Sequence, residues 1–476
     1  MNPAEDGAIK ALQQAFTRRR MLGLGATGLV ASVLAACGSS KKADAPATTA
    51  AAPATTAGAA VATTAAAVVA GANAAKFGGG GKDGKIKIGF TAPLTGPLGG
   101  FGEANDFTIK TMQGLWKDGI QLGGKSFAVE LIVKDTKSSS DEAAAQALKL
   151  ITDDKVDMMI AIATPEMINP VADQCEANGI PCLSTLAPWQ PYFFGRKGDP
   201  AKGFDWTYHF FWGAGQLIGV FTDIWNSVPT NKTIGLFAPN DPDGVALSDA
   251  KTGFPAGAAS AGYKLIDGGR YNTLSPTFET MIGQFKDADV IVGIPIPPDF
   301  ATFWKQANQQ GLKPKVVTIA KAVLQPSSVE ALGGLGDGIS SEVWWTPTHP
   351  YKSSLNGTTC KALGDEFGTS TGKQWSQFVG FVHALFEVTL DSVARAGSTD
   401  KKKLVEAIAA TKLDTMVGPI SFNQKELPKN VCPTPLVGGQ WQKTEGGKYP
   451  YDLVIISNTQ APQIPLGGKI KPIVYK

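Results

Sequence analysis

The stretch Ile88–Met112, IGFTAPLTGPLGGFGEANDFTIKTM, decides the fold. It continues an apolar strand predicted at Ile86–Phe90 and passes through a loop rich in glycine and proline, residues 91–102. A helix is predicted to follow over Glu103–Trp116. A strand, a glycine-rich loop and a helix in this order indicate a crossover unit of a parallel α/β sheet.

The same alternation continues along the chain. Short apolar strands that alternate with helices of about 10 to 15 residues predict parallel sheets covered on both faces. The first run has strands at Phe127–Val133, Val156–Ile162 and Pro181–Ser184, with helices at Asp141–Asp153 and Met167–Ala177. After an aromatic segment expected to be irregular, Ala187–Phe211, the second run has strands at Thr233–Ala238, Tyr263–Ile266, Asp289–Ile294 and Lys315–Ile319. Two runs separated by a break predict two doubly wound α/β lobes.

Two helices deserve separate predictions. A long amphipathic helix is expected at Phe378–Ala396, with its apolar residues on one face. His383 lies off that apolar stripe and is expected to face solvent. Pro255 interrupts the helix expected after Gly244, so that helix is predicted to be bent or split.

The loops that follow the predicted strands are candidates for a ligand site. In parallel α/β sheets, ligands bind beyond the carboxyl ends of the strands. Loop 91–102 leads into a helix whose free N–H groups favour an anion, and its glycines allow close approach of the backbone. The loops after the third and fourth strands bring Ala163, Thr164, Thr185 and Ala187. We expect these loops to form a carboxylate site, with simple helix capping as the alternative.

The N-terminal region carries an export signal. Residues 17–37, TRRRMLGLGATGLVASVLAAC, combine a basic flank, a short apolar run and small residues before a cysteine. The run is too short for a membrane span of ~20 residues. Thr17–Leu22 resembles a twin-arginine signal, and Leu34–Cys37 resembles the lipobox of bacterial lipoproteins, in which Cys37 is acylated. We expect an exported protein, lipid-anchored at Cys37 to the outer face of the bacterial cytoplasmic membrane; the alternatives are an ordinary signal peptide or a buried apolar segment.

Residues 38–84 are predicted to form a flexible stalk. Most of this segment is alanine, threonine and proline, which bury too little apolar surface to become ordered. Near its end, Gly78–Lys82 resembles part of a phosphate-binding loop. Such a loop needs serine or threonine after the lysine, but Asp83 follows, so a glycine-rich hinge is the better interpretation.

Composition excludes several classes of function. A chain of 476 residues suits two or three domains. The net charge of +3, without a basic run interleaved with aromatics, argues against nucleic acid as a partner. The 3 histidines are widely separated and lack metal-ligand spacing, so no metal and no cofactor are expected. Beyond the signal, no apolar run reaches about 18 residues, so no membrane span is predicted. A monomer is expected.

Four cysteines remain after the one predicted to be lipidated. An even number in an oxidising compartment favours disulfides, and four cysteines allow three pairings. The favoured pairing joins Cys175 to Cys182 across a short turn and Cys360 to Cys432 across a long loop.

An enzymatic site is the weaker alternative. Gly368–Gly372, with Ser370 at its centre, formally matches the nucleophile elbow of serine hydrolases. That elbow must lie between a strand and a helix, whereas a predicted helix, Lys361–Phe367, precedes this segment. A connector between two helices is therefore expected, and the protein is predicted not to be an enzyme.

From Ile86 to about Ile456 the chain resembles the branched-chain amino acid-binding proteins, the solute receptors of one class of ABC importer. The resemblance rests on Ile88–Met112, on NGIPCLST at Asn178–Thr185 and on TMVGPISFNQ at Thr415–Gln424. It implies two lobes joined by a three-strand hinge, a small ligand bound between them, closure about the hinge and recognition by a membrane permease. We assign residues 85–205 and 335–425 to the first lobe and 206–334 and 426–476 to the second. A sensory receptor of the same fold, serving a membrane signalling partner, is the alternative.

The resemblance also implies site residues. In the family an aromatic after the first strand packs on the ligand, and Phe101, in the loop that contains Leu98, matches that position. Thr164, Thr185 and Ala187, with backbone from Ala163, match positions that hold the ligand carboxylate. The second lobe departs from the family pattern: Asp243 replaces an aromatic, Pro297 or Pro298 replaces another, and Lys321 replaces an acid that pairs with the ligand ammonium.

These departures suggest a ligand other than a branched-chain amino acid. A lysine directed into the cleft would repel an ammonium group and attract a carboxylate, so a carboxylate or amide compound, with an aromatic body as one option, is the hypothesis. Asp243 or Asp299 could instead supply an acid and restore an amino acid ligand. Five tryptophans expected near the crossovers and the cleft rim could contact the ligand or pack in the core: Trp189, Trp206, Trp212, Trp344 and Trp345.

Overall fold

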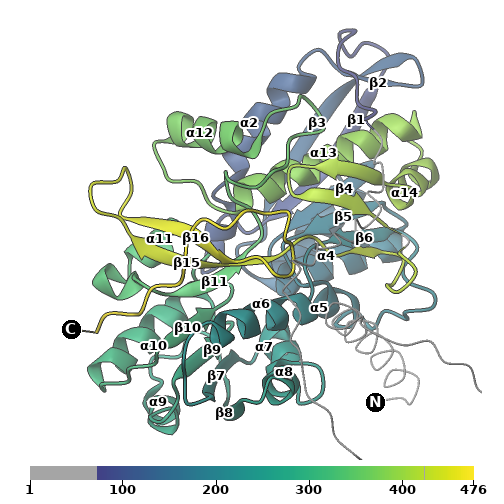
Figure 1. The fold of residues 1–476 in the computed structure, drawn as a ribbon. Coiled ribbons are helices and arrows are strands. Elements are labelled where there is room, and N and C mark those ends of the chain that lie inside the picture. The colour runs from purple at the N-terminus through teal and green to yellow at the C-terminus, as the bar shows by residue number, and fades with distance from the viewer. Residues whose placement is uncertain (1–71, 423, 476) are drawn as a thin grey trace, which may run out of the picture. The chain divides into compact units, whose positions relative to one another are not determined.

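The computed structural model describes residues 72–422 and 424–475. These residues form two seven-stranded sheets, each with its own covering helices, and a separate two-stranded sheet made by β12 (Lys412–Thr415) and β13 (Gly418–Ser421) (Figure 1). The predicted export signal, the lipidation site at Cys37 and stalk residues 38–71 lie outside the described residues. The prediction of two doubly wound α/β lobes is confirmed.

The first sheet is parallel except at one edge, where β2 runs antiparallel to β3. Its central strand β1 has buried residues on both faces, as expected of a strand covered by helices on each side. The order across the sheet is β14 (Val431–Cys432), β6 (Thr207–Phe210), β5 (Cys182–Thr185), β4 (Met158–Ile162), β1 (Lys85–Ala92), β3 (Lys125–Asp135) and β2 (Ile120–Leu122).

Helices cover both faces of this sheet. The chain moves from β1 to β3 in one direction and returns past β1 to β4, so right-handed crossovers place α2 (Asn105–Trp116) and α3 (Ser140–Thr152) on opposite faces. On one face α3 packs against α4 (Pro165–Asn178); on the other, α2 packs against α13 (Phe378–Ala396). The predicted long helix at residues 378–396 is thus confirmed, and α12 (Cys360–Thr371) and α14 (Lys401–Ala409) pack beside it.

The second sheet combines five parallel strands with an antiparallel pair at one edge, because β15 runs antiparallel to both β11 and β16. The order across the sheet is β16 (Tyr451–Ser457), β15 (Val437–Lys443), β11 (Ser340–Val343), β10 (Val316–Ile319), β9 (Val290–Gly293), β7 (Thr233–Pro239) and β8 (Lys264–Tyr271). The helices of this lobe are α6 (Ala214–Asn226), α7 (Pro242–Leu247), α8 (Phe254–Ser260), α9 (Glu279–Gln284), α10 (Pro297–Gln309) and α11 (Pro326–Glu330). The split predicted near Pro255 is confirmed, since α7 ends before Pro255 and α8 begins at Phe254.

The chain crosses between the sheets three times: after β6, after β11 and between β14 and β15. The predicted lobe boundaries are therefore shifted. Strand β6 belongs to the first sheet, so this sheet extends beyond residue 205, and β11 belongs to the second sheet, so residues 335–343 were assigned to the wrong lobe. Strand β14 adds residues 431–432 to the first sheet. The prediction missed β6 because its fully buried residues lie inside a segment rich in aromatics and proline, where the alternation is hidden.

The end of the predicted stalk is part of the fold. Phe77 forms a β-bridge with Ile120, and Lys82 forms one with Phe127. The amide of Ala74 donates a hydrogen bond to Asp391 of α13 over 2.9 Å. Residues 72–84 therefore pack on the first lobe, and the prediction of a stalk reaching residue 84 is wrong for this part.

All four cysteines of the folded region are buried free thiols, so both predicted disulfides are wrong. Cys175 on α4 and Cys182 on β5 lie close enough to interact but remain unbonded. The Cys360 thiol faces the carbonyl oxygen of Met416 over 3.4 Å, and the Cys432 sulfur accepts from the amide of Ser421 over 3.3 Å. The even count carried no information about which thiols face each other.

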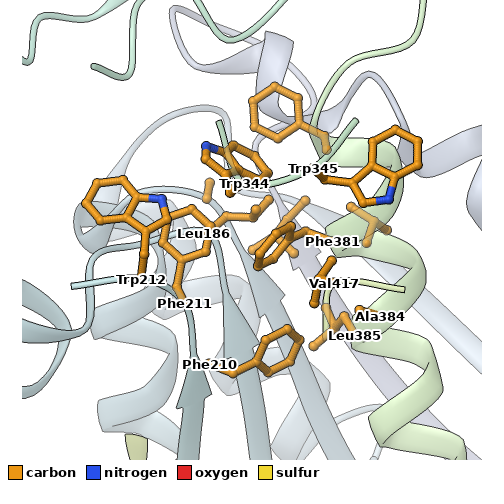
Figure 2. Packing of buried hydrophobic residues seen from close by; sticks show 14 of the residues in the cluster. Leu186, Phe210, Phe211, Trp212, Trp344, Trp345, Phe381, Ala384, Leu385 and Val417 are labelled. Atoms are coloured by element: carbon orange, nitrogen blue, oxygen red, sulfur yellow. The ribbon is translucent and has the colours of Figure 1, made fainter. Parts of the chain in front are cut away.

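Aromatic side chains fill the space around the crossovers (Figure 2). Phe211 follows β6 and lies 5.2 Å from the ring of Trp344, which follows β11. Both rings contact Phe381 of α13, at centroid distances of 5.1 and 4.8 Å. At Gly380 an added Cβ atom would lie 2.3 Å from the ring of Trp345, so this ring packs directly on the helix backbone. The crossovers are thus anchored to α13 by buried packing.

A buried carboxylate on α13 also fixes two loops. Glu387 accepts hydrogen bonds from the amide and the hydroxyl of Ser354, on the second crossover, and from the amide of Met416 over 2.8 Å. One helical turn away, His383 Nε2 lies 2.8 Å from Ser353 Oγ. The expectation that His383 faces solvent is wrong, because the apolar face of α13 is wider than one stripe and both sides of the helix are covered. Burial raises the pKa of Glu387 to about 7.

We predict that the Glu387 carboxyl makes stability fall as pH rises. Its folded pKa, about 7, lies above the ordinary value of 4.5, so the stabilisation present below the unfolded pKa is lost as pH rises through the folded pKa. Chemical unfolding at pH 5 and pH 8 should show the wild-type protein losing up to about 3 kcal/mol relative to Glu387→Gln over this interval. Glu366→Gln, at an exposed site on α12, is the control. An equal stability difference at both pH values would contradict the prediction.

Candidate ligand-binding cleft

The loops at the carboxyl ends of several strands meet the crossovers around one small cavity of ≈ 20 Å³. Its walls come from both lobes, which matches the position at which parallel sheets bind ligands. The lining residues are Phe101, Thr164, Leu186, Pro188, Phe211, Trp212, Asp243, Ile294, Lys321, Leu324, Glu342 and Trp344. A cavity of this size holds about one water molecule, so a larger ligand requires the lobes to separate.

Half of the residues predicted for the site line this cavity: Phe101, Thr164, Trp212, Asp243 and Lys321. Phe101 lies in a short 3-10 helix and its ring contacts Phe378 at 4.9 Å. The other half of the predicted set is not among the lining residues: Leu98, Ala163, Thr185, Ala187 and Pro297.

Each residue of this second group has another role. The Thr185 hydroxyl donates to the carbonyl of Phe210 over 2.6 Å and so joins β5 to β6. The carbonyl of Ala187 lies 2.7 Å from His209 Nε2. Leu98 is buried in the core, and Pro297 begins α10. Ala163 supports the site indirectly, since it shapes the loop that carries Thr164.

Three loops at the cleft contain a non-glycine residue with positive φ. These are Ala163 (φ 101°) after β4, Leu186 (φ 75°) after β5 and Lys321 (φ 67°) after β10. Such conformations cost of order 1–3 kcal/mol and persist where the surrounding structure fixes them, often at binding sites. Their occurrence at three strand ends around one cavity marks this edge as the functional one.

The buried ammonium of Lys321 bridges the two lobes. Its Nζ lies 2.8 Å from Asp241 and 2.9 Å from Asp243, both in the second lobe, and 3.4 Å from Glu166 on α4 of the first lobe. The side chain is only 5% exposed. The hypothesis that this charge is free to attract a ligand carboxylate is therefore corrected: three acids of the chain already surround it.

Acidic groups outnumber the lysine. Although burial opposes its charge, the neighbouring carboxylates raise the pKa of Lys321 well above its ordinary value, which keeps it protonated. Burial raises the pKa of Asp243 to about 7, against the opposing effect of Lys321. Glu342, which accepts from the backbone amide of Lys321 over 3.0 Å, also has its pKa raised to about 7 by burial. Asp243 and Glu342 are therefore partly protonated near neutral pH, while Lys321 keeps its charge.

The acidic cluster also has the composition of a metal site. One carboxylate oxygen from each of Glu166, Asp241 and Asp243 lies within 4.8 Å of the others. The Lys321 ammonium contacts all three groups, however, and so takes the position a cation would need. The residues present do not favour a metal ion here.

Four buried polar atoms in the cavity wall have no hydrogen-bond partner in the described part of the chain: Thr164 Oγ1, Trp212 Nε1, Trp344 Nε1 and Asp243 Oδ1. All four side chains belong to residues that are at most 2% exposed. An unsatisfied buried polar atom costs about 1–3 kcal/mol, so these four are expected to pair with a group that enters the cavity. A water molecule or a polar group of a ligand could serve.

His209 is a supporting residue that the sequence analysis did not identify. Its Nδ1 lies 2.9 Å from Ser184 Oγ, and its ring stacks on Tyr192 at 4.3 Å. Burial lowers its pKa to about 3, so it is neutral, and Nε2–H donates to the carbonyl of Ala187. This contact fixes the loop before Pro188. No spacing in the sequence indicated this role, because Ser184 and Ala187 lie 25 and 22 residues away from His209 along the chain.

Glu166, Asp241 and Glu342 were also missed. Asp241 did carry a signal: it precedes a proline and glycine after a predicted strand, and it caps α7 by accepting from the amide of Gly244 over 2.7 Å. Glu166 and Glu342 carried none, since only the fold brings them to Lys321.

Comparison with known proteins agrees with this architecture. A family model described as periplasmic binding protein matches residues 85–445. The chain belongs to the periplasmic binding protein family, and its two lobes have the type I fold of that family. The fold expected from the sequence resemblance is confirmed.

Solved structures show the same fold at low sequence identity. A leucine-binding protein from Thermotoga maritima is 19% identical, with a TM-score of 0.63 over 79% of this chain and 99% of its own. A branched-chain amino acid transporter substrate-binding protein from Streptococcus pneumoniae, in complex with isoleucine, is 16% identical, with a TM-score of 0.60 over 78% and 99%. A solute-binding protein of an ABC transporter from Rhodopseudomonas palustris, in complex with 3,4-dihydroxybenzoic acid, is 18% identical, with a TM-score of 0.63 over 79% and 99%.

We predict that Lys321→Met destabilises the protein by roughly 3–5 kcal/mol, because it leaves buried carboxylates without their cation. Adding Asp243→Asn should recover part of this loss by removing one of those charges. Equilibrium unfolding of both variants, with Lys305→Met at an exposed site on α10 as the control, tests the prediction. A Lys321→Met variant as stable as the wild type would show that the Lys321 ammonium does not stabilise the carboxylates around it.

Proposed function

We propose that this protein is an extracytoplasmic solute-binding lipoprotein of an ABC import system. The observation that carries the proposal is the cavity between the lobes, whose wall holds four buried polar atoms without partners. Solute enters when the lobes separate at the three crossovers, pairs with these atoms and is enclosed as the lobes close. The closed form then delivers it to membrane permease subunits, the partner implied by the family.

The chemistry of the wall supports a small solute with an apolar body and a polar group. Phe101, Phe211, Trp212 and Trp344 supply apolar surface, and the unpartnered atoms supply hydrogen bonds. The solved structures of the same fold include a leucine-binding protein and complexes with isoleucine and with 3,4-dihydroxybenzoic acid, all small molecules. We infer an amino-acid-like, amide or carboxylate solute.

Export and anchoring are part of the proposal. No helix within residues 72–422 and 424–475 is both long and apolar enough to cross a membrane. The arginine-rich signal and the lipobox at Leu34–Cys37 support export and a lipid anchor at Cys37. Residues 38–71 would then act as a stalk between the anchor and the folded lobes.

The lipid anchor predicts a change of location on mutation. Cys37→Ser removes the thiol that would be acylated, so the protein should no longer incorporate a labelled fatty acid and should leave the membrane fraction. Ser39→Ala, two residues away, is the control and should behave as wild type. Fatty acid labelling and fractionation of cells make the measurement. A Cys37→Ser variant that remains labelled and membrane-bound would contradict the anchor.

Solute binding predicts stabilisation by a small molecule. A compound present at 100 times its dissociation constant should add ~2.7 kcal/mol to the free energy of unfolding. A thermal-shift screen of amino acids, amides and aromatic acids should find at least one stabilising class. The Phe101→Ala variant should lose the stabilisation because this ring lies in the cavity wall. Stabilisation that persists in Phe101→Ala would place the site elsewhere.

A further inference from the structure

The cavity-lining residues have four buried polar atoms without a hydrogen-bond partner among the described residues, and these divide into donors and acceptors. An indole nitrogen only donates, so Trp212 Nε1 and Trp344 Nε1 require an acceptor on the solute. Asp243 Oδ1, when ionised, only accepts and requires a donor. Thr164 Oγ1 can do either. The solute therefore has to present both an acceptor and a donor within one small space.

The two indoles are placed to act together. Figure 2 shows the nitrogen-bearing edges of Trp212 and Trp344 directed toward the space beside Leu186. Phe211 contacts both rings, with its ring centroid 5.0 Å from that of Trp212 and 5.2 Å from that of Trp344. The first and second crossovers thus each supply one indole N–H from a residue that lines the same cavity.

The charges around the cavity select against ionic solutes. The ammonium of Lys321 already lies among Asp241, Asp243 and Glu166, where the amine of an amino acid would have to fit. No other lysine, and no arginine, is among the described residues that line the cavity. A solute carboxylate would therefore meet the carboxyl groups of Asp243 and Glu342 with no cation other than the already paired Lys321, and a solute amine would compete with Lys321 for Asp241 and Asp243.

We propose that the solute is an uncharged carboxamide on a small apolar body. Its carbonyl oxygen accepts from Trp212 Nε1 and Trp344 Nε1, and its N–H group donates to Asp243 Oδ1. The apolar body packs on Phe101 and Phe211. This inference rests on the proposed solute-binding function and names the chemical class that the same cavity takes.

Calorimetric titration of the whole folded protein with matched compounds tests the inference. The probes are isovaleramide, isovalerate and leucine, which share a branched chain, and benzamide and benzoate, which share a ring. We expect each amide to bind at least 10-fold more tightly than its own acid, and isovaleramide to bind more tightly than leucine. If leucine binds more tightly than isovaleramide, or if either acid binds more tightly than its own amide, the inference is overturned while the solute-binding function still stands. Absence of binding by all five compounds also overturns the inference, whereas the solute-binding function is judged by the broader thermal-shift screen.

Two variants test the assigned donors. Trp212→Phe and Trp344→Phe each keep a ring but remove the N–H, and each should weaken binding of the preferred amide about 10-fold, the loss of one hydrogen bond. Trp375→Phe removes an indole that is half-buried and lies outside the cavity wall, and it should leave the affinity unchanged. Unchanged affinity in both cavity variants overturns the assignment of the two indoles as hydrogen-bond donors to the solute carbonyl. If a variant fails to fold, the comparison of amides with acids on the wild-type protein still tests the inference.

Discussion

The contact between the buried Lys321 ammonium and three carboxylates organises the cleft. It joins β10 and α7 of the second lobe to α4 of the first. A single unpaired charge at this depth would be strongly destabilising, so the acids and the lysine stabilise one another only as a set. The same set fixes the electrostatic character of the wall, because one ammonium is shared by several acidic groups.

The aromatic crossovers supply the second constraint. Phe211, Trp212 and Trp344 are buried where the chain passes between the lobes, and α13 packs against this cluster (Figure 2). The residues that connect the lobes are therefore also residues of the cavity wall. Under the proposed function, separation of the lobes would therefore move the same side chains that contact the solute.

The architecture was largely predictable because it depends on local sequence patterns, namely the alternation of apolar strands with helices. Alternating apolar strands and helices predicted four of the seven strands in each sheet, and α13 was predicted at its observed bounds. Phe101 and Thr164 were found because ligands bind after the carboxyl ends of parallel strands. Strand β6 was missed because aromatics and prolines mask its pattern. The lobe boundaries shifted with it.

The tertiary partners could not be read from the sequence. Lys321 was judged as an isolated charge, since nothing local linked it to Glu166, 155 residues away. His209 and Glu387 likewise act through partners from distant elements. The cysteines were paired by their number and their separation in the sequence, and although Cys175 and Cys182 do lie close together, no bond joins them. The position of a residue just after a strand predicts that it reaches the cleft. Which charges are already paired there depends on the tertiary fold and could not be predicted from the sequence.

The central claim is that the cleft binds its solute while the chain's own lysine remains among the acids. A crystal structure of the complex with the tightest-binding compound tests it most directly. The account predicts solute oxygen within hydrogen-bonding distance of the indole nitrogens of Trp212 and Trp344, with Lys321 still on Asp241 and Asp243. A solute ammonium seated on those two carboxylates, with Lys321 displaced, would contradict it.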